Sequence, residues 1–356
     1  MTNDKLVVLY EDAVGLLKQL IAAPSYSKDE DATAMVIEQF LKTKKIRASR
    51  YINNVWVANK HFDVNKPSVL LNSHHDTVRP NKDYTRDPFA AEEKGGKLYG
   101  LGANDAGGCL VSLIAAFLYF YEREDLKYNL LFAASAEEEI SGVNGIESLL
   151  PMFRNIDFAI VGEPTLMNMA VAEKGLMVVD CAVAGRSGHA ARDEGENAIY
   201  KAIQDIEWFR SFEFPKVSAM LGPVKMNVTM INAGTQHNVI PASCTFTVDV
   251  RINDCYTHEE VLGIIQEHVH CEVNARSMRL RATSISHDHQ IVRAGLNMGL
   301  TPFGSATLSD KALMPFPALK IGPGDSARSH MADEYIFVDE IENGIDIYVK
   351  LLNEVL

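Results

Sequence analysis

Positive charge is what this sequence most clearly lacks. Its 34 lysines and arginines face 47 aspartates and glutamates, so the formal net charge is −13. A protein that follows a phosphate backbone needs a basic surplus to displace counterions, and anionic membrane surfaces attract basic segments. The composition therefore argues against nucleic-acid partners and, more weakly, against a membrane partner.

Long apolar runs and patterned cysteines are also missing. The longest apolar stretch, Cys109–Tyr121, is interrupted by Ser112 and is shorter than the ~20 residues of a membrane span. Residues 1–5 do not have the basic-then-apolar layout of a secretory signal. The five cysteines are scattered without a CxxC pair, which is typical of reduced thiols in the cytosol. We therefore expect a cytoplasmic protein.

The first half of the chain alternates helical and strand-like patterns. After a helical region at 8–45, the apolar periodicity predicts strands at 54–59 and 68–73, a buried helix at 106–122, and strands at 128–135 and 157–162. Such alternation predicts an α/β domain with a mostly parallel central sheet flanked by helices.

The pattern changes after Pro164. The order strand-helix-strand-strand-helix-strand predicts an inserted α+β domain of the ferredoxin-like kind, with an antiparallel sheet. From about residue 287 the chain returns to helix-strand-helix. We therefore expect a discontinuous catalytic domain, residues 1–171 and 285–356, that carries a lid at 172–284.

Acidic residues and histidines follow the predicted strands in five separate clusters. Strand ends in an α/β sheet face a common crevice, so residues distant in sequence can converge there. Two histidines with several carboxylates form a nitrogen and oxygen ligand set suited to zinc or a similar divalent ion. The clusters are His74-His75-Asp76, Asn104-Asp105, Glu137-Glu138-Glu139, Glu163 and His330.

Within the first cluster, one histidine can bind a metal while the carboxylate two residues on orients it. His74 and Asp76 share one face of the strand, whereas the rival ligand His75 should point to the other face. Asp105 lies in a glycine-rich turn before a helix, where it would repel a bound phosphate but suits a bridge between two cations. The alternatives are a polar surface turn for the histidines and an N-cap for Asp105.

The three consecutive glutamates repel one another, and most acidic runs are solvated. This run directly follows a buried-looking strand, where a nearby dication would offset the repulsion. One glutamate could then ligate while its neighbour handles protons. Glu163 and His330 are weak signals taken alone, since a loop histidine is more often simply exposed.

Together these motifs resemble the M20 family of co-catalytic zinc hydrolases. The resemblance extends over essentially the whole chain and is greatest to the branch of acetylornithine deacetylase and succinyl-diaminopimelate desuccinylase. The segment Gly322-Pro-Gly-Asp-Ser is similar to one in a related lysine-biosynthesis hydrolase. The resemblance implies a zinc-exopeptidase-like catalytic domain and a lid through which two subunits form a homodimer.

The resemblance also implies a role for each matching residue. Asp76 would orient the first ligand, and Glu138 would be the proton shuttle; a one-residue shift of the alignment would make Glu137 the shuttle and Glu138 a ligand. Gly107 stands where the family usually has lysine, and Glu137 replaces the usual aspartate, so no ligand is lost. The implied ligands of two Zn²⁺ ions per subunit are His74, Asp105, Glu139, Glu163 and His330.

In the lid, His189 resembles the histidine that reaches a neighbouring active site, and Asn238 and Arg251 resemble residues that hold a substrate carboxylate. A succinyl group would add a carboxylate, and its pocket should need another cation. Arg328, two residues before His330, is a candidate on position; the alternative is a salt-bridged loop arginine.

The expected reaction is hydrolysis of a small N-acyl amino acid, with Co²⁺ or Mn²⁺ able to replace Zn²⁺. By resemblance alone, the leading substrate is N-acetyl-ornithine, deacetylated in arginine biosynthesis. N-succinyl-ornithine, N-succinyl-diaminopimelate and small peptides are alternatives within the same chemistry. A catalytically inactive metal-binding interaction protein is one alternative of a different class, and the complete ligand set together with Glu138 speaks against it. A nucleotide-dependent α/β enzyme is the other, and it would need a glycine-rich phosphate loop that the sequence does not contain.

Overall fold

The computed structural model describes residues 2–192 and 194–356, and the chain divides into two compact units. The first comprises Met1–Val171, Ile285–Phe303 and Ser309–Leu356, and the second comprises Ala172–Ser284 and Gly304–Leu308. The sequence-based boundaries had placed residues 304–308 in the catalytic domain. They group with the second unit because Ser305 accepts a hydrogen bond from the Lys174 backbone (3.2 Å) and Gly304 lies against the Met220 carbonyl.

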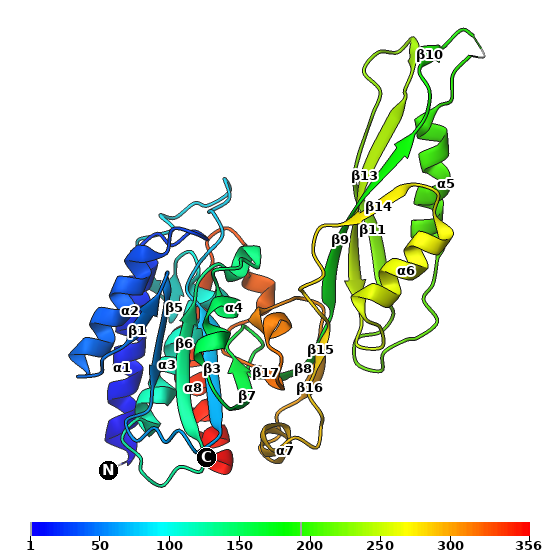
Figure 1. Cartoon of the computed structure of the whole chain (residues 1–356). Coiled ribbons are helices and arrows are strands. Elements are labelled where there is room, and N and C mark those ends of the chain that lie inside the picture. The colour runs from blue at the N-terminus through cyan, green and yellow to red at the C-terminus, as the bar shows by residue number, and fades with distance from the viewer. Residues whose placement is uncertain (1, 193) are drawn as a thin grey trace. The chain divides into compact units, whose positions relative to one another are not determined.

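A mixed sheet forms the centre of the first unit (Figure 1). Only its four central strands, β6, β3, β7 and β17, run parallel; β1, β2, β8 and β15 join antiparallel at the two edges. The α/β class is confirmed, but the sheet is less parallel than predicted. Strand β1 forms a hairpin with β2, and β2, β8 and β15 pair antiparallel with strands that are distant in sequence. In spatial order the strands are β1 (Ser49–Tyr51), β2 (Asn54–Ala58), β6 (Asn129–Ser135), β3 (Ser68–His74), β7 (Ile156–Val161), β17 (Ala318–Lys320), β8 (Met169–Glu173) and β15 (Thr283–Ser284), with β16 (Pro302–Ser305) also paired to β8.

Helix α3 is the central core helix of this unit. Nearly all its side chains are buried, and it packs against α1, α8, β3 and β6. Among the described residues, the window Ala103–Phe120 is the one helical segment long and apolar enough to cross a membrane, and 78% of it is buried inside the protein. The helices of the unit are α1 (Thr2–Ile21), α2 (Asp31–Thr43), α3 (Gly108–Phe120), α4 (Ile146–Leu149), α7 (Gln290–Asn297) and α8 (Val338–Val355).

Short elements complete the first unit and carry several site residues. A small antiparallel sheet is built from β4 (Glu93–Lys94), β5 (Lys97–Tyr99) and β18 (Tyr335–Phe337). Single helical turns occupy Ala103–Gly107, Glu138–Ile140, Leu150–Met152, Asp310–Leu313 and Ser326–Arg328.

The second unit has the predicted ferredoxin-like order, β9-α5-β11-β13-α6-β14. Its sheet, β11-β13-β9-β14, is fully antiparallel, and along β9 buried and partly exposed side chains alternate. The buried face packs with both helices into an apolar core of its own. The elements are β9 (Gly175–Ala184), β10 (Gly188–His189), α5 (Ala198–Ser211), β11 (Lys225–Ala233), β12 (Val239–Ile240), β13 (Ser243–Ile252), α6 (His258–His268) and β14 (Glu272–Ala275).

Candidate metal centre and active site

Three neighbouring parallel strands deliver most of the candidate site. His74 is the last residue of β3, Glu138 and Glu139 form the turn that follows β6, and Glu163 comes just after β7. Strands β6, β3 and β7 are adjacent and parallel. Because parallel strands end at the same edge of a sheet, these four side chains are brought together by the topology alone.

The site is completed by two loops. Asp105 comes from the single turn that precedes α3, and His330 comes from the loop between β17 and β18. His330 Nε2 lies 3.1 Å from Glu139 Oε2 and 3.7 Å from Asp105 Oδ2. Residues separated by more than two hundred positions thus meet in one cluster.

Asp105 stands between the two histidines. Its Oδ1 lies 3.3 Å from His74 Nε2, while its Oδ2 faces His330. The same His74 nitrogen lies 3.9 Å from Glu138 Oε2 and 3.9 Å from Glu163 Oε1. The structure therefore gathers all five predicted ligands and the predicted shuttle in one place.

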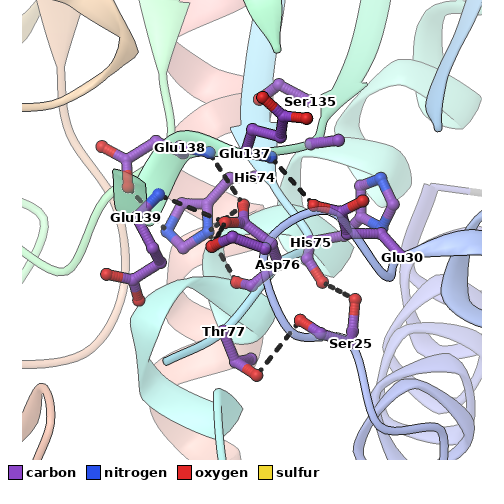
Figure 2. A network of polar contacts seen from close by, with 12 residues as sticks. Ser25, Glu30, His74, His75, Asp76, Thr77, Ser135, Glu137, Glu138 and Glu139 are labelled. Atoms are coloured by element: carbon purple, nitrogen blue, oxygen red, sulfur yellow. Dashed lines mark hydrogen bonds and ion pairs between the residues drawn. The ribbon is translucent and has the colours of Figure 1, made fainter. Parts of the chain in front are cut away.

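Asp76 makes hydrogen bonds to His74 and to the turn that carries Glu138 and Glu139 (Figure 2). The ring of His74 donates from Nδ1 to the Asp76 carbonyl (2.9 Å), which leaves its Nε2 directed at the carboxylates. The fully buried Asp76 carboxylate accepts from the backbone N–H groups of Glu138 (3.0 Å) and Glu139 (3.2 Å) and from the Ser27 hydroxyl (2.7 Å). Asp76 thus orients the histidine through its backbone carbonyl and holds the glutamate turn through its carboxylate.

The three glutamates face different ways. Glu137 has a positive φ of 55°, its backbone N–H donates to Glu30 (3.2 Å), and its carboxylate accepts from the Asn144 side chain (3.0 Å). Glu138 and Glu139 instead face the histidines. Glu137 is thus turned away from the histidines, which favours Glu138 over Glu137 as the shuttle; the assignment stays a prediction.

His75 lies outside the cluster. Its ring nitrogens contact the Thr33 hydroxyl (2.8 Å) and the Asn53 carbonyl (3.0 Å). Burial lowers the pKa of His75 to about 4, so the ring is neutral at physiological pH. His75 is therefore a satisfied core histidine, on the opposite face from His74.

Negative charge is concentrated in the cluster, and the ionisation of its groups reflects this. The hydrogen bond to Glu139 raises the pKa of His330 to about 9. Burial raises the pKa of the Glu138 carboxyl well above its ordinary value, despite the nearby His74. Burial and the Asp105 charge raise the pKa of Glu334 to about 8. The raised pKa values of Glu138 and Glu334 come first from burial, and nearby carboxylates add to both. A divalent cation would offset this excess of negative charge.

The donor atoms fit such cations. Two overlapping groups of side chains could each hold an ion, because the candidate ligand atoms within each group lie within 4.8 Å of one another. One group is His74, Glu138 and Glu163, and the other is His74, Asp105 and Glu139. Imidazole nitrogen and carboxylate oxygen are the usual ligands of catalytic zinc and related ions. The residues present can therefore hold metal.

The predicted lid residues all lie in the second unit. His189 pairs with Val239 across the β10–β12 ribbon, and the next residue, Ala190, donates its N–H to the Asn238 carbonyl (3.0 Å). His189 and Asn238 are therefore neighbours. Arg251 lies near the other end of β13, where its guanidinium pairs with Asp249 at 2.8 and 3.0 Å.

Arg328 has a partner that the substrate prediction did not foresee. Its guanidinium makes a two-pronged ion pair with Glu340 (2.6 and 2.9 Å) and lies over the rings of Tyr335 and Phe337. Both arms of the guanidinium are therefore engaged within the protein. The structure places Arg328 in the salt-bridged state that was the alternative interpretation of this residue.

Two buried carboxylates near the site were missed in the sequence. Glu334 accepts three backbone hydrogen bonds from the loop that carries Asp105. Asp310 accepts from the Ser135 hydroxyl at the end of β6 (2.5 Å), and burial raises its pKa to about 6. Neither follows a recognisable strand, so no local pattern distinguishes the buried Glu334 from the partly exposed Asp333 beside it.

A cluster of histidines and carboxylates at the strand ends of an α/β sheet, with an inserted α+β unit, is the layout of a metallohydrolase. The family model described as peptidase family M20/M25/M40 matches residues 70–354. The chain therefore belongs to this family of metallohydrolases.

Named relatives and a solved structure agree with this assignment. Succinyl-diaminopimelate desuccinylase 2 of Ruegeria sp. is 23% identical, covering 96% of this chain and 95% of the relative. The succinyl-diaminopimelate desuccinylase of Beijerinckia indica is 29% identical, covering 69% and 70%. A dinuclear metal-binding peptidase of the M20 family from Bacillus subtilis has the same fold, with a TM-score of 0.73, 16% identity, and coverage of 97% of this chain and 98% of that one.

Proposed function

We propose that this protein hydrolyses the amide bond of a small N-acyl amino acid and releases the free amine. The observation that carries the proposal is the meeting of two histidines and three glutamates around Asp105, with Asp105 within 4 Å of both rings. An inactive binding protein would need the metal ligands but not a further glutamate beside them. In this proposal Glu138 faces the same space but has the proton-transfer role and is not one of the assigned ligands.

The proposed metal pair would divide these residues into two sets. His74 and Glu163 would hold one ion, Glu139 and His330 the other, and Asp105 would bridge them. When bound, such ions lower the pKa of water toward ~7, so that hydroxide is available at neutral pH, and they polarise the substrate carbonyl. Zinc is the leading choice for the ions.

The chain's own residues would supply positioning and proton transfer. Glu138 would accept a proton from the attacking water and later deliver it to the leaving amine, as a buried carboxyl of raised pKa can do near neutral pH. Asp76 would hold both His74 and the glutamate turn in place. By the family resemblance, His189 would reach a neighbouring subunit's active site and donate a hydrogen bond to the developing oxyanion. Asn238 and Arg251 lie toward opposite ends of β13, so they would reach the substrate carboxylate from different subunits.

N-acetyl-ornithine remains the leading substrate, as in arginine biosynthesis. N-succinyl-diaminopimelate is the second candidate, since two relatives carry the name of its desuccinylase. The pairing of Arg328 with Glu340 removes the cation that seemed best placed beside His330 for a succinyl carboxylate. This pairing supports an uncharged acyl group over a charged one.

The decisive experiment is an assay of metal-loaded enzyme against matched substrates. Acetylated and succinylated ornithine, citrulline, lysine and diaminopimelate would be compared by kcat/KM with Zn²⁺, Co²⁺ and Mn²⁺. Hydrolysis of none of them by any metal form would refute the proposal, whereas a preference for succinyl substrates would refute only the acyl assignment. His189→Ala should lower kcat and leave metal content intact.

We also propose that two copies associate through the second unit. In the part of the chain that the structure describes, β11 is an edge strand with β13 as its one neighbour in the sheet, and edge strands can pair with another chain. Met230 and Ile231 on this strand are each 55% exposed, and on α5 Tyr200 is 70% and Ile203 54% exposed. Analytical ultracentrifugation should give a dimer for the native chain and a monomer for Ile231→Lys with Tyr200→Glu; a native monomer at micromolar concentration contradicts the dimer.

A further inference from the structure

The Glu334 carboxylate accepts hydrogen bonds from the loop that carries Asp105. One carboxylate oxygen accepts from the backbone N–H groups of Asn104 (2.8 Å) and Asp105 (2.9 Å), and the other accepts from Gly102 (3.1 Å). The side chain is 2% exposed and comes from a segment about 230 positions further along the chain. Three charge-assisted hydrogen bonds from a buried carboxylate fix a loop more firmly than neutral ones.

The same short segment carries a candidate metal ligand. His330 lies four residues before Glu334, and its ring reaches to within 3.7 Å of Asp105. The Asn104 side chain adds a second link, because it donates to the Asp325 carbonyl (3.0 Å) and accepts from the Asp325 N–H (3.1 Å). The loop of Asp105 and the segment of His330 are therefore tied together on both sides of the site.

Placing Glu334 here is electrostatically unfavourable unless positive charge is present. Its carboxylate is buried and faces the like charge of Asp105. An amide or a hydroxyl oxygen could accept hydrogen bonds from some of the loop's backbone N–H groups without adding negative charge to an already acidic cluster. Nearby dications would offset the electrostatic free energy of burying this carboxylate. The carboxylate would then fix the distance between the metal ligands.

We infer that Glu334 is a positioning residue that sets the distance between Asp105 and His330 and thereby the affinity for the second dication, the one between Glu139 and His330. The inference rests on the proposed function only for the existence of the metal pair. It assigns Glu334 no contact with substrate. It predicts that a change at Glu334 acts on metal binding before it acts on the fold.

The test uses the full chain, freed of metal by a chelator, and titrated with Zn²⁺ against a chromophoric competitor. Glu334→Gln keeps the shape of the side chain but turns an amino group toward backbone N–H groups. Asp333→Asn is the matched control, because Asp333 is the preceding residue and likewise accepts from backbone, at Thr85 and Arg86 (2.9 Å each), but faces away from the metal cluster. Stepwise dissociation constants, the Co²⁺ absorption spectrum and the melting temperature of the metal-free chain are measured for all three proteins.

For Glu334→Gln we expect the second dissociation constant to rise by about 10–100-fold, with a changed Co²⁺ spectrum, while Asp333→Asn stays within about threefold of the native chain. The metal-free melting temperatures of the two variants should be similar. Equal metal affinity in Glu334→Gln and Asp333→Asn overturns the inference, as does an affinity loss matched by an equally large loss of metal-free stability.

Two further results keep the test decisive. If Glu334→Gln does not fold, Glu334→Asp replaces it, since it keeps the charge but retracts the carboxylate by one methylene, and the same comparison applies. If the native chain itself binds no pair of dications, the proposed function fails and the role of Glu334 fails with it. If the native chain binds the pair and the two variants bind it equally well, only the role of Glu334 fails, so the two failures are distinguishable.

Discussion

The Glu138 carboxylate lies 3.9 Å from the His74 ring, while the carboxylate of its neighbour Glu137 is turned to Asn144. This difference predicts opposite outcomes for two isosteric substitutions. Glu138→Gln should retain bound metal and lose ~10²–10⁴-fold in kcat, because an amide cannot accept the proton. Glu137→Gln should keep most of the activity. Bound metal and kcat of the two purified variants test this assignment. An inactive Glu137→Gln together with an active Glu138→Gln would make Glu137 the proton shuttle.

A second prediction concerns Asp76, which accepts hydrogen bonds from the backbone of both Glu138 and Glu139. Asp76→Asn keeps the size of the side chain but replaces one carboxylate oxygen with an amide NH2 group. That group cannot accept the hydrogen bond that a backbone N–H now donates. We expect a loss of ~10–100-fold in metal affinity, the usual effect of changing a group that orients metal ligands. Isothermal titration with Zn²⁺ measures it.

The control for Asp76 is Ser27→Ala. Ser27 donates one hydrogen bond to the same carboxylate, but it touches neither His74 nor the glutamate turn. Its removal should change metal affinity by much less than Asp76→Asn. If the two substitutions have equal effects, Asp76 contributes only through the burial of its charge.

Much of this site could be predicted from the sequence because strands end where apolar runs end. His74 and Glu163 follow such runs directly, and adjacent parallel strands bring them to one edge. His330 lies in a turn-rich loop and is a weak signal taken alone, so only the resemblance gave it a role as a metal ligand. Glu334 could not be found, because its partners are backbone N–H groups far away in sequence, and any acidic residue could in principle accept from them.

The fold shows the same division between local and long-range information. The ferredoxin-like order of the second unit follows from local periodicity and was confirmed by the structure. The direction of β2 relative to β6, or of β8 relative to β17, depends on connections that hydrophobic patterns do not encode. The partner of Arg328 is a third case, because Glu340 lies on α8 and becomes a neighbour only after the fold has formed.

A third prediction follows from that ion pair. Arg328→Gln should reduce the free energy of unfolding by about 1–2 kcal/mol, a value between those of exposed and buried pairs. It should leave the ratio of KM values for succinylated and acetylated ornithine unchanged. Glu340→Gln is the matched control for stability. A selective rise in KM for the succinylated substrate in Arg328→Gln, but not in Glu340→Gln, would return Arg328 to the substrate site.

The last prediction concerns pH and the second unit. His258 is 1% exposed, its Nε2 donates to the Leu176 carbonyl (3.2 Å), and burial lowers its pKa below the ordinary 6.5. Between pH 6.5 and that lower value, the unfolded chain binds a proton that the folded chain does not. The stability of this unit should therefore fall as the pH is lowered through this window.

His258→Asn should weaken this pH dependence, because asparagine does not titrate. The second unit can be followed by itself in a Trp56→Phe background, where Trp208 on α5 is the remaining tryptophan of the two in the chain. Urea unfolding at pH 7.5 and 5.0 then gives the loss of stability for each protein. We expect a larger loss with His258 than with asparagine; equal losses would mean that other groups carry the pH dependence of this unit.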